Sequence, residues 1–149
     1  MADLISNLFT HLHPAITHFP IVLLIASVLL DLYGRWQPAV RRTAWITLLL
    51  GTFSTIPAVI TGIIAHLPYE ETAVIDSIEQ HQWLGFLTTA IFIALTAWRW
   101  RSRRANGEQT ASWPYLTVGI LGLVALTLAG LTGGNLVYNL GVGVREIVR

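Results

Sequence analysis

The chain has 149 residues, of which 54% are hydrophobic and only 11% are charged, and its mean hydropathy is +0.61. A soluble domain carries about 25% charged residues, so this composition indicates an integral membrane protein. The net charge of +1, with no basic stretch interleaved with aromatic residues, gives no sign of a nucleic-acid partner. The sequence contains no cysteine, which excludes disulfides, cysteine-ligated clusters and covalently attached haem. Any metal is therefore held by histidine, carboxylate, amide or backbone groups.

The N-terminal segment is not a secretory signal peptide, because its first fourteen residues include no Lys or Arg. Apolar residues instead recur at helical spacing in this segment: Leu4, Ile5, Leu8, Phe9 and Leu12. This pattern predicts a short helix that lies in the plane of the membrane interface.

Four apolar segments follow, each close to the ~20 residues that a helix needs to cross a bilayer. They cover approximately residues 15–32, 43–67, 77–98 and 115–132. The connections between them are too short to separate two domains. The sequence therefore predicts an all-α fold: a single domain over residues 1–149, built as an up-down bundle of four transmembrane helices after a short interfacial helix.

The arginines predict how the bundle is oriented. Three lie in the connection after the first segment and four in the connection after the third, whereas the connection after the second has no Arg or Lys. By the positive-inside rule, the first and third connections face the cytoplasm. Both termini then lie on the periplasmic side of a bacterial inner (cytoplasmic) membrane. Asp31, near the cytoplasmic end of the first segment, is expected to pair with Arg35 or a neighbouring loop arginine.

All five histidines fall at the periplasmic end of this predicted bundle. His11, His13 and His18 lie at the start of the first segment, His66 closes the second, and His81 opens the third. An ionisable side chain at a membrane helix end is costly unless it has a role, so the cluster predicts a ligand site.

Two of these histidines are the strongest candidates. His18 and His81 each lie four residues inside a predicted helix start, roughly 6 Å below it. Their helices are diagonal partners in an up-down bundle, roughly 11–14 Å apart for neighbours at ~8–10 Å. That gap suits a flat macrocycle with a central metal, and we expect b-type haem with His18 and His81 as its metal ligands.

The other histidines have competing explanations. His13 could cap the helix before Pro14, and His66 could simply favour the negative end of its helix. If a second haem is bound, His13 and His66 are its best ligand pair. His11 falls in the predicted surface helix and is the weakest candidate.

The two helices without the main ligands carry stripes of small residues at spacings of three and four. The stripes are Gly51, Thr55, Ala58, Gly62 and Ala65 in the second segment, and Gly122, Ala125, Ala129 and Gly133 in the fourth. Such stripes usually mean close helix packing. The alternative is that they leave room for the faces of a porphyrin.

Several motifs also identify a family. His13-Pro14, His18-Phe19-Pro20 and the C-terminal run from Gly133-Gly134 to Gly141-Val142-Gly143-Val144 resemble the bacterial membrane family called domain of unknown function 2231. The resemblance implies a four-helix membrane protein of undetermined activity, sometimes found with Rieske-type redox partners, and hence a haem-binding redox role. Members of the family often carry His directly before the final GVGV, where this chain has Leu140. If that His is a ligand, His66 is the residue expected to compensate.

The leading hypothesis is thus a membrane b-type cytochrome that transfers electrons within a respiratory or photosynthetic complex, rather than a stand-alone enzyme. Two axial histidines leave no open iron position, which favours electron transfer over oxygen chemistry. One alternative is a non-redox accessory or structural subunit, including one that binds a chlorophyll-type pigment through a single axial His. The other is a periplasm-facing Zn or Cu site made by His13, His18, His66 and His81, since neutral imidazole suits both metals.

Overall fold

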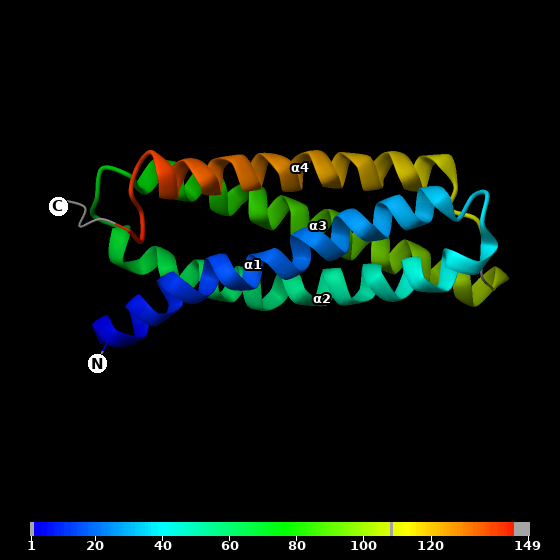
Figure 1. Ribbon diagram of the computed structural model, residues 1–149, viewed down its shortest axis with the longest axis horizontal. Helices are drawn as coiled ribbons and strands as arrows, with labels where there is room; N and C mark the ends of the chain where they lie inside the picture. Colours follow the sequence, from blue (N-terminus) through cyan, green and yellow to red (C-terminus); the bar gives the residue numbers. More distant parts are fainter. Residues whose placement is uncertain (1, 108, 145–149) are drawn as a thin grey trace.

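The computed structural model describes residues 2–107 and 109–144, and side chains within this part from Leu12 onward. It contains four long helices: α1 (Ala2–Tyr33), α2 (Arg41–His66), α3 (Ile75–Asn106) and α4 (Trp113–Tyr138). Two single 3₁₀ turns flank α2: η1 (Pro38–Val40) and η2 (Leu67–Tyr69). The described part has no strand, and Figure 1 shows the helices as one elongated up-and-down bundle. The predicted fold class is confirmed.

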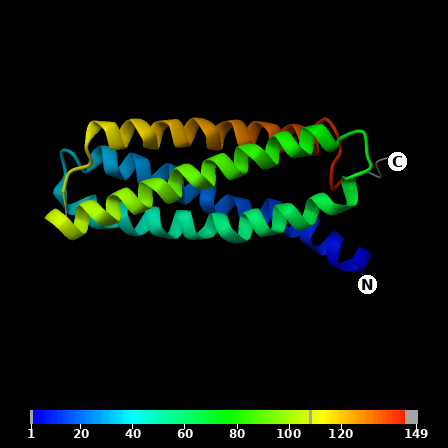
Figure 2. The ribbon, with the colours of Figure 1, turned by 180° about the vertical axis from the view of Figure 1, so that it is seen from behind.

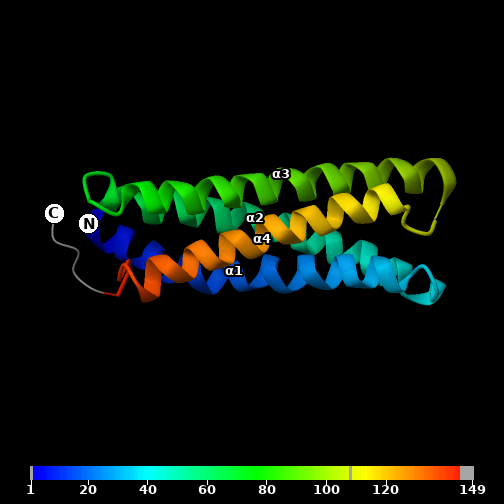
Figure 3. The same ribbon diagram turned by 90° about the horizontal axis from the view of Figure 1, so that it is seen from above.

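Helices that follow one another in the chain lie side by side and antiparallel (Figures 1 and 3). α1 packs most extensively on α2, and α3 on α4, so the bundle consists of two α-hairpins. α1 and α3 are diagonal to each other, as the sequence predicts. Figure 2 shows the α2–α3 connection and the N-terminus at one end, which we call the histidine end. The opposite end, with the α1–α2 and α3–α4 connections, is the arginine end.

The outward surface of the bundle is apolar. Each of the four helices is long and apolar enough to cross a membrane. Large hydrophobic side chains point away from the bundle, including Phe19 (65% exposed), Phe53 (64%) and Leu131 (66%). A water-soluble bundle would carry polar residues on that face. The bundle therefore lies in a lipid bilayer.

α1 is longer than the sequence predicts. The N-terminal helix is present but is continuous with the first membrane helix, because Pro14 and Pro20 both lie inside α1 and end neither piece. A proline inside a helix removes one backbone hydrogen bond and bends the helix, which can then continue. The first turns lean away from the bundle in Figure 1. Side chains 1–11, including His11 and the predicted interfacial face, lie outside the described part.

α3 and α4 also extend beyond the predicted segments. α3 continues through the arginine-rich stretch to Asn106, and α4 runs through Gly133-Gly134 to Tyr138. The start of α4 is well defined, because Ser112 Oγ accepts a hydrogen bond from the Tyr115 backbone N–H (3.4 Å) and a proline stands in the first turn.

The core is concentrated toward the arginine end. Leu24, Leu48, Phe92 and Leu95 are almost completely buried, one from α1, one from α2 and two from α3, and Leu116 of α4 joins their cluster. This half of the bundle is filled by large side chains. The other half encloses a cavity.

Candidate cofactor site: a cavity with paired histidines

The histidine end encloses a cavity of about 490 Å³ lined by all four helices. Its lining includes His13, His18, His66 and His81, so the prediction that these four side chains gather at one end is confirmed. Ligand pockets in proteins measure about 300–1,000 Å³, so the cavity has the size of a cofactor site.

His13 of α1 and His81 of α3 face each other across this cavity. Their ring centroids are 6.1 Å apart and the ring planes are inclined by 78°. Two imidazoles that share a metal have metal–nitrogen bonds of about 2 Å each. Each ring centre lies about 1.1 Å behind the bound nitrogen, given C–N bonds of about 1.3 Å. The two centroids are then about 6 Å apart by this geometry, close to the distance observed here.

The hydrogen bonds of the two rings fix their tautomers. The Thr61 hydroxyl, 3.2 Å from His13 Nδ1, already donates to carbonyls of its own helix, so it accepts from His13 Nδ1–H. The Ala129 carbonyl oxygen, 2.9 Å from His81 Nδ1, can only accept. Both rings therefore carry the proton on Nδ1, and neither Nε2 lone pair has a partner in the described part. Metal-binding histidines are commonly held in this way, since the bond to Nδ1–H orients the ring and makes Nε2 more basic.

Two glycines allow these rings to lie against the other helices. A Cβ added to Gly62 of α2 would be 2.9 Å from Cε1 of His13, and one added to Gly133 of α4 would be 2.9 Å from Cε1 of His81. Real Cβ atoms do not approach so closely. An alanine at either position would thus force the neighbouring imidazole to move.

Farther from the cavity, the same small-residue stripes serve helix packing. A Cβ on Gly51 would be 2.7 Å from the Leu24 side chain, and a Cβ on Gly122 would be 3.0 Å from Phe92. At these inner positions the packing explanation of the stripes is confirmed. The inner glycines let helices pack closely, and the outer ones receive the histidines.

The two hairpins are an internal repeat. The pattern Ala-x-x-Thr-Gly occurs at residues 58–62 of α2 and again at residues 129–133 of α4. His81 follows His13 at the same interval along the chain as Phe92 follows Leu24. The contacts repeat as well, since each His ring lies against the Gly that ends the pattern. An approximate two-fold relation therefore places the two imidazoles in equivalent positions. Sequence reasoning missed this repeat, although the Ala-x-x-Thr-Gly pattern shows it.

His18 lies elsewhere. It is exposed at the edge of the cavity, and its Nδ1 is 2.6 Å from the Pro14 carbonyl oxygen of its own helix. Five residues after His13, it points about 140° away around the helix axis. The structure thus brings His81 to His13 and leaves His18 outside the facing pair.

His66 lies beside the pair at the end of α2. Its Nδ1 is 2.7 Å from Gln82 Oε1. Its Nε2 is buried and has no hydrogen-bond partner in the described part of the chain. Buried polar atoms normally have partners, so this nitrogen is available to a group in the cavity.

Among residues 12–107 and 109–144, no three His, Asp or Glu side chains converge as a metal site. The acidic residues near this end, Glu70, Glu71, Asp76 and Glu79, are all exposed, as expected for a solvated loop face. Two imidazoles leave a bare Zn or Cu ion under-coordinated. They suffice for a metal whose other four positions are filled by a macrocycle.

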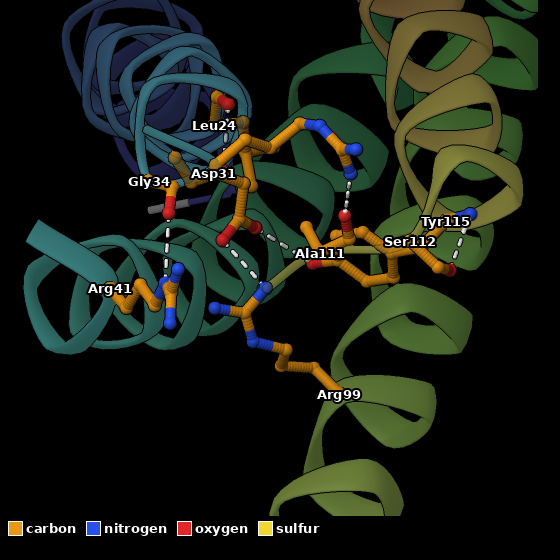
Figure 4. A network of polar contacts seen from close by, with 10 residues as sticks. Leu24, Asp31, Gly34, Arg41, Arg99, Ala111, Ser112 and Tyr115 are labelled. Carbon is orange, nitrogen blue, oxygen red and sulfur yellow. Dashed lines mark hydrogen bonds and ion pairs between the residues drawn. The ribbon is translucent and has the colours of Figure 1, made fainter. Parts of the chain in front are cut away.

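The arginine end has its own polar centre, shown in Figure 4. Arg99 of α3 forms a buried ion pair with Asp31 of α1 (Nη1 to Oδ1, 2.6 Å), and Tyr115 of α4 donates to Asp31 Oδ2 (3.1 Å). Asp31 therefore pairs with Arg99, one of the neighbouring arginines, and not with Arg35. Arg35 instead donates to the Ala111 carbonyl oxygen (2.6 Å). Arg99 follows Asp31 at the interval that separates His81 from His13, so this pair also joins equivalent positions of the repeat.

Comparison with known proteins adds the family. The sequence model of the family described as a predicted membrane protein, domain of unknown function 2231, matches residues 10–146. The chain belongs to this family. No protein of curated function and no solved structure matches the chain. The family description gives a membrane protein without an activity, so the function rests on the chemistry of the cavity.

The C-terminal motif of the family resemblance forms one end of the cavity. Val142 lines the cavity, and the backbone N–H of Gly143 donates to the Tyr69 hydroxyl (3.1 Å) in η2. Gly143 has a φ of 75°, which favours glycine. Leu140, where relatives often carry His, lies just before this turn and is not part of the cavity lining.

Proposed function

We propose that the protein is a membrane b-type cytochrome that holds one haem between His13 and His81 and transfers electrons within a respiratory or photosynthetic complex. The observation that carries the proposal is the facing pair of imidazoles, at the separation of two rings on one metal, each with Nδ1–H bonded outward. When bound, haem supplies reversible one-electron chemistry at its iron.

The cavity lining supports a flat ligand. Gly85 and Gly134 line the cavity, and a Cβ added to either of them would meet no atom within 4 Å. Protein packing therefore does not explain why these positions are glycine. A macrocycle held by His13 and His81 would need open space beside the two rings, and Gly85 and Gly134 leave such space.

Two axial histidines favour electron transfer. They leave no open position for oxygen or substrate, so the chain acts as an electron-transfer subunit and not as a stand-alone enzyme. A chlorophyll-type pigment needs one axial His, which would leave the second facing imidazole without a role. Since His81 uses His13 as its partner, the His13–His66 pair for a second haem is no longer available, and one haem is expected.

The arginine asymmetry supports an orientation with the haem near the periplasmic face. Seven arginines lie at the arginine end, in the α1–α2 connection or in the adjoining turns of α2 and α3, and the α2–α3 connection has no Arg or Lys. The histidine end and both termini are then periplasmic. An electron partner would approach from that side or within the bilayer.

The experiment is an optical spectrum of the protein purified from a haem-replete host, with three single variants. The wild type should be coloured and show low-spin b-type haem on reduction. His13→Ala and His81→Ala should each lose the low-spin spectrum, since the single Met of the chain, Met1, is far from the pair in sequence and there is no Cys to replace a lost ligand.

His18→Ala is the matched control, because it removes an imidazole at the edge of the same cavity. It should keep the spectrum. Loss of low-spin haem in His18→Ala with retention in His13→Ala would instead establish His18 and His81 as the ligands. A wild-type protein without haem would refute the proposed function.

A further inference from the structure

The two α-hairpins are related by an approximate two-fold relation, but two pairs of equivalent residues that line the cavity differ in chemistry. Val137 of α4 is the equivalent of His66 of α2, because it follows His66 at the interval that separates Gly133 from Gly62. Gln82 of α3 is likewise the equivalent of Pro14 of α1, since each directly follows a facing histidine. All four residues line the cavity. One edge of the cavity thus carries an imidazole and an amide, where the equivalent edge carries an aliphatic side chain and a proline.

The polar edge has an unused hydrogen-bonding atom. Gln82 Oε1 is 2.7 Å from His66 Nδ1 and fixes the ring, and the buried Nε2 of His66 has no partner in the described part. His66 lies one helical turn beyond Gly62, which contacts the His13 ring, so the backbone of His66 is about 6 Å nearer the end of the bundle than that of Gly62. An unpaired buried nitrogen is costly unless a ligand satisfies it.

We infer that His66, positioned by Gln82, binds the carboxyl edge of the haem and thereby sets the orientation of the haem in a nearly symmetric site. This inference rests on the proposed function. Both carboxyl groups of b-type haem lie on one edge, and its other edges are apolar. The imidazole Nε2 and a haem carboxyl share one proton in a charge-assisted hydrogen bond, and the amide N–H₂ of Gln82 can donate to the same edge.

Within residues 12–107 and 109–144, the charges at this end leave few other groups for a carboxylate. The α2–α3 connection has four acidic residues in or next to it and no Arg or Lys. Within the described residues, the histidines are the groups at this end that can become cationic. His13 and His81 face each other, and His18 is exposed. His66, with its buried Nε2, is the histidine that remains for the carboxyl edge.

The experiment titrates the full-length apoprotein in detergent with two probes, haem and haem dimethyl ester, which lacks free carboxyl groups. The variants are His66→Val, which places the equivalent residue of α4 there, and Gln82→Leu, with His18→Ala as the control. His66→Val should weaken haem binding about tenfold or more and leave ester binding unchanged, since a charge-assisted hydrogen bond is lost only with the carboxyl ligand. Gln82→Leu should have a smaller effect in the same direction.

Two results would overturn the inference while the proposed function stands. One is equal weakening of haem and ester by His66→Val, and the other is no weakening of either. A carboxyl-dependent loss in His18→Ala with none in His66→Val would also overturn it, by moving the contact to His18. If the wild type gives a low-spin spectrum with neither probe, the proposed function fails together with the inference.

Discussion

At the scale of single residues, five positions along α1 separate a histidine that faces His81 across the cavity from one that does not. His13 lies seven residues before Pro20, the first buried position in the described part of α1. His81 lies seven residues before Thr88, which is buried on α3. Seven residues are nearly two helical turns, so each histidine lies on the same face of its helix as the buried residue that follows it. His18 does not lie on that face of α1.

The sequence alone predicted the histidine cluster and the diagonal helices, but it selected His18 by depth. That depth was counted from Pro14 as the start of a helix, and α1 begins at Ala2 instead. Depth along a helix also says nothing about direction around it. The direction of His13 becomes clear only once the structure shows that Pro20, seven residues later, is buried.

The buried ion pair at the arginine end leads to a prediction about stability. Arg99→Ala should lower the free energy of unfolding by about 3–5 kcal/mol, because it leaves the Asp31 carboxylate buried without its partner. Arg101→Ala is the matched control, since Arg101 is exposed on the same helix and its removal should have little effect. The measurement is denaturant unfolding of the purified protein in mixed micelles.

A double variant separates the free-energy cost of burying the two charges from the stabilisation that their pairing gives. The double variant Asp31→Leu/Arg99→Leu should recover part of the loss, because it removes both charges together. Unfolding of Arg99→Ala that is indistinguishable from that of Arg101→Ala would show that the ion pair contributes nothing to stability.

At the scale of helices, the composition predicted which helices exist and in what order better than it predicted the residues at which they begin and end. α2 begins and ends within two residues of its predicted limits, because both of its ends coincide with changes in composition. α1 and α4 continue past Pro14 and past Gly133-Gly134, which the sequence treats as boundaries. Proline and glycine weaken a helix locally, but in a bilayer an interrupted backbone is costly, so the helix continues.

The contacts of Gly62 and Gly133 give a prediction at this scale. Gly62→Ala and Gly133→Ala should each lower haem affinity about tenfold or more, because the added Cβ displaces the imidazole that lies 2.9 Å from it. Gly130→Ala is the control, because it also replaces a glycine of α4 with alanine and so changes helix propensity equally. The Cβ added at Gly130 meets no atom within 4 Å. This variant should bind haem normally.

Haem titration of the three apoproteins checks this prediction, with circular dichroism to establish that all are folded. Equal affinity in Gly133→Ala and Gly130→Ala would mean that the His81 ring does not need the space that Gly133 leaves.

At the scale of the whole molecule, the two ends of the bundle differ in kind. The arginine end is filled by large apolar side chains and contains a buried ion pair, whereas the histidine end contains a cavity of about 490 Å³. The internal repeat explains how both centres arise, since each joins equivalent positions of the two hairpins. The sequence contains the repeat, but the interval from α1 to α3 differs from the interval from α2 to α4, so no single offset reveals it.

The arginine distribution predicts the orientation of this asymmetric molecule. Alkaline phosphatase fused to the C-terminus should be active in cells, because that terminus is expected in the periplasm. The same enzyme inserted in the α3–α4 connection, near Thr110, should be inactive. Stable expression of both fusions is the control, and the reverse pattern of activity would place the histidine end in the cytoplasm.

The most direct measurement is the electron paramagnetic resonance spectrum of the oxidised wild-type protein, taken together with its haem-to-protein ratio. One haem per chain is expected, with a strongly anisotropic low-spin ferric signal, because imidazole planes inclined by 78° leave two of the iron orbitals close in energy. A high-spin signal would show that His13 and His81 do not both bind the iron, and a protein that neither contains nor takes up haem would contradict the proposed cytochrome altogether.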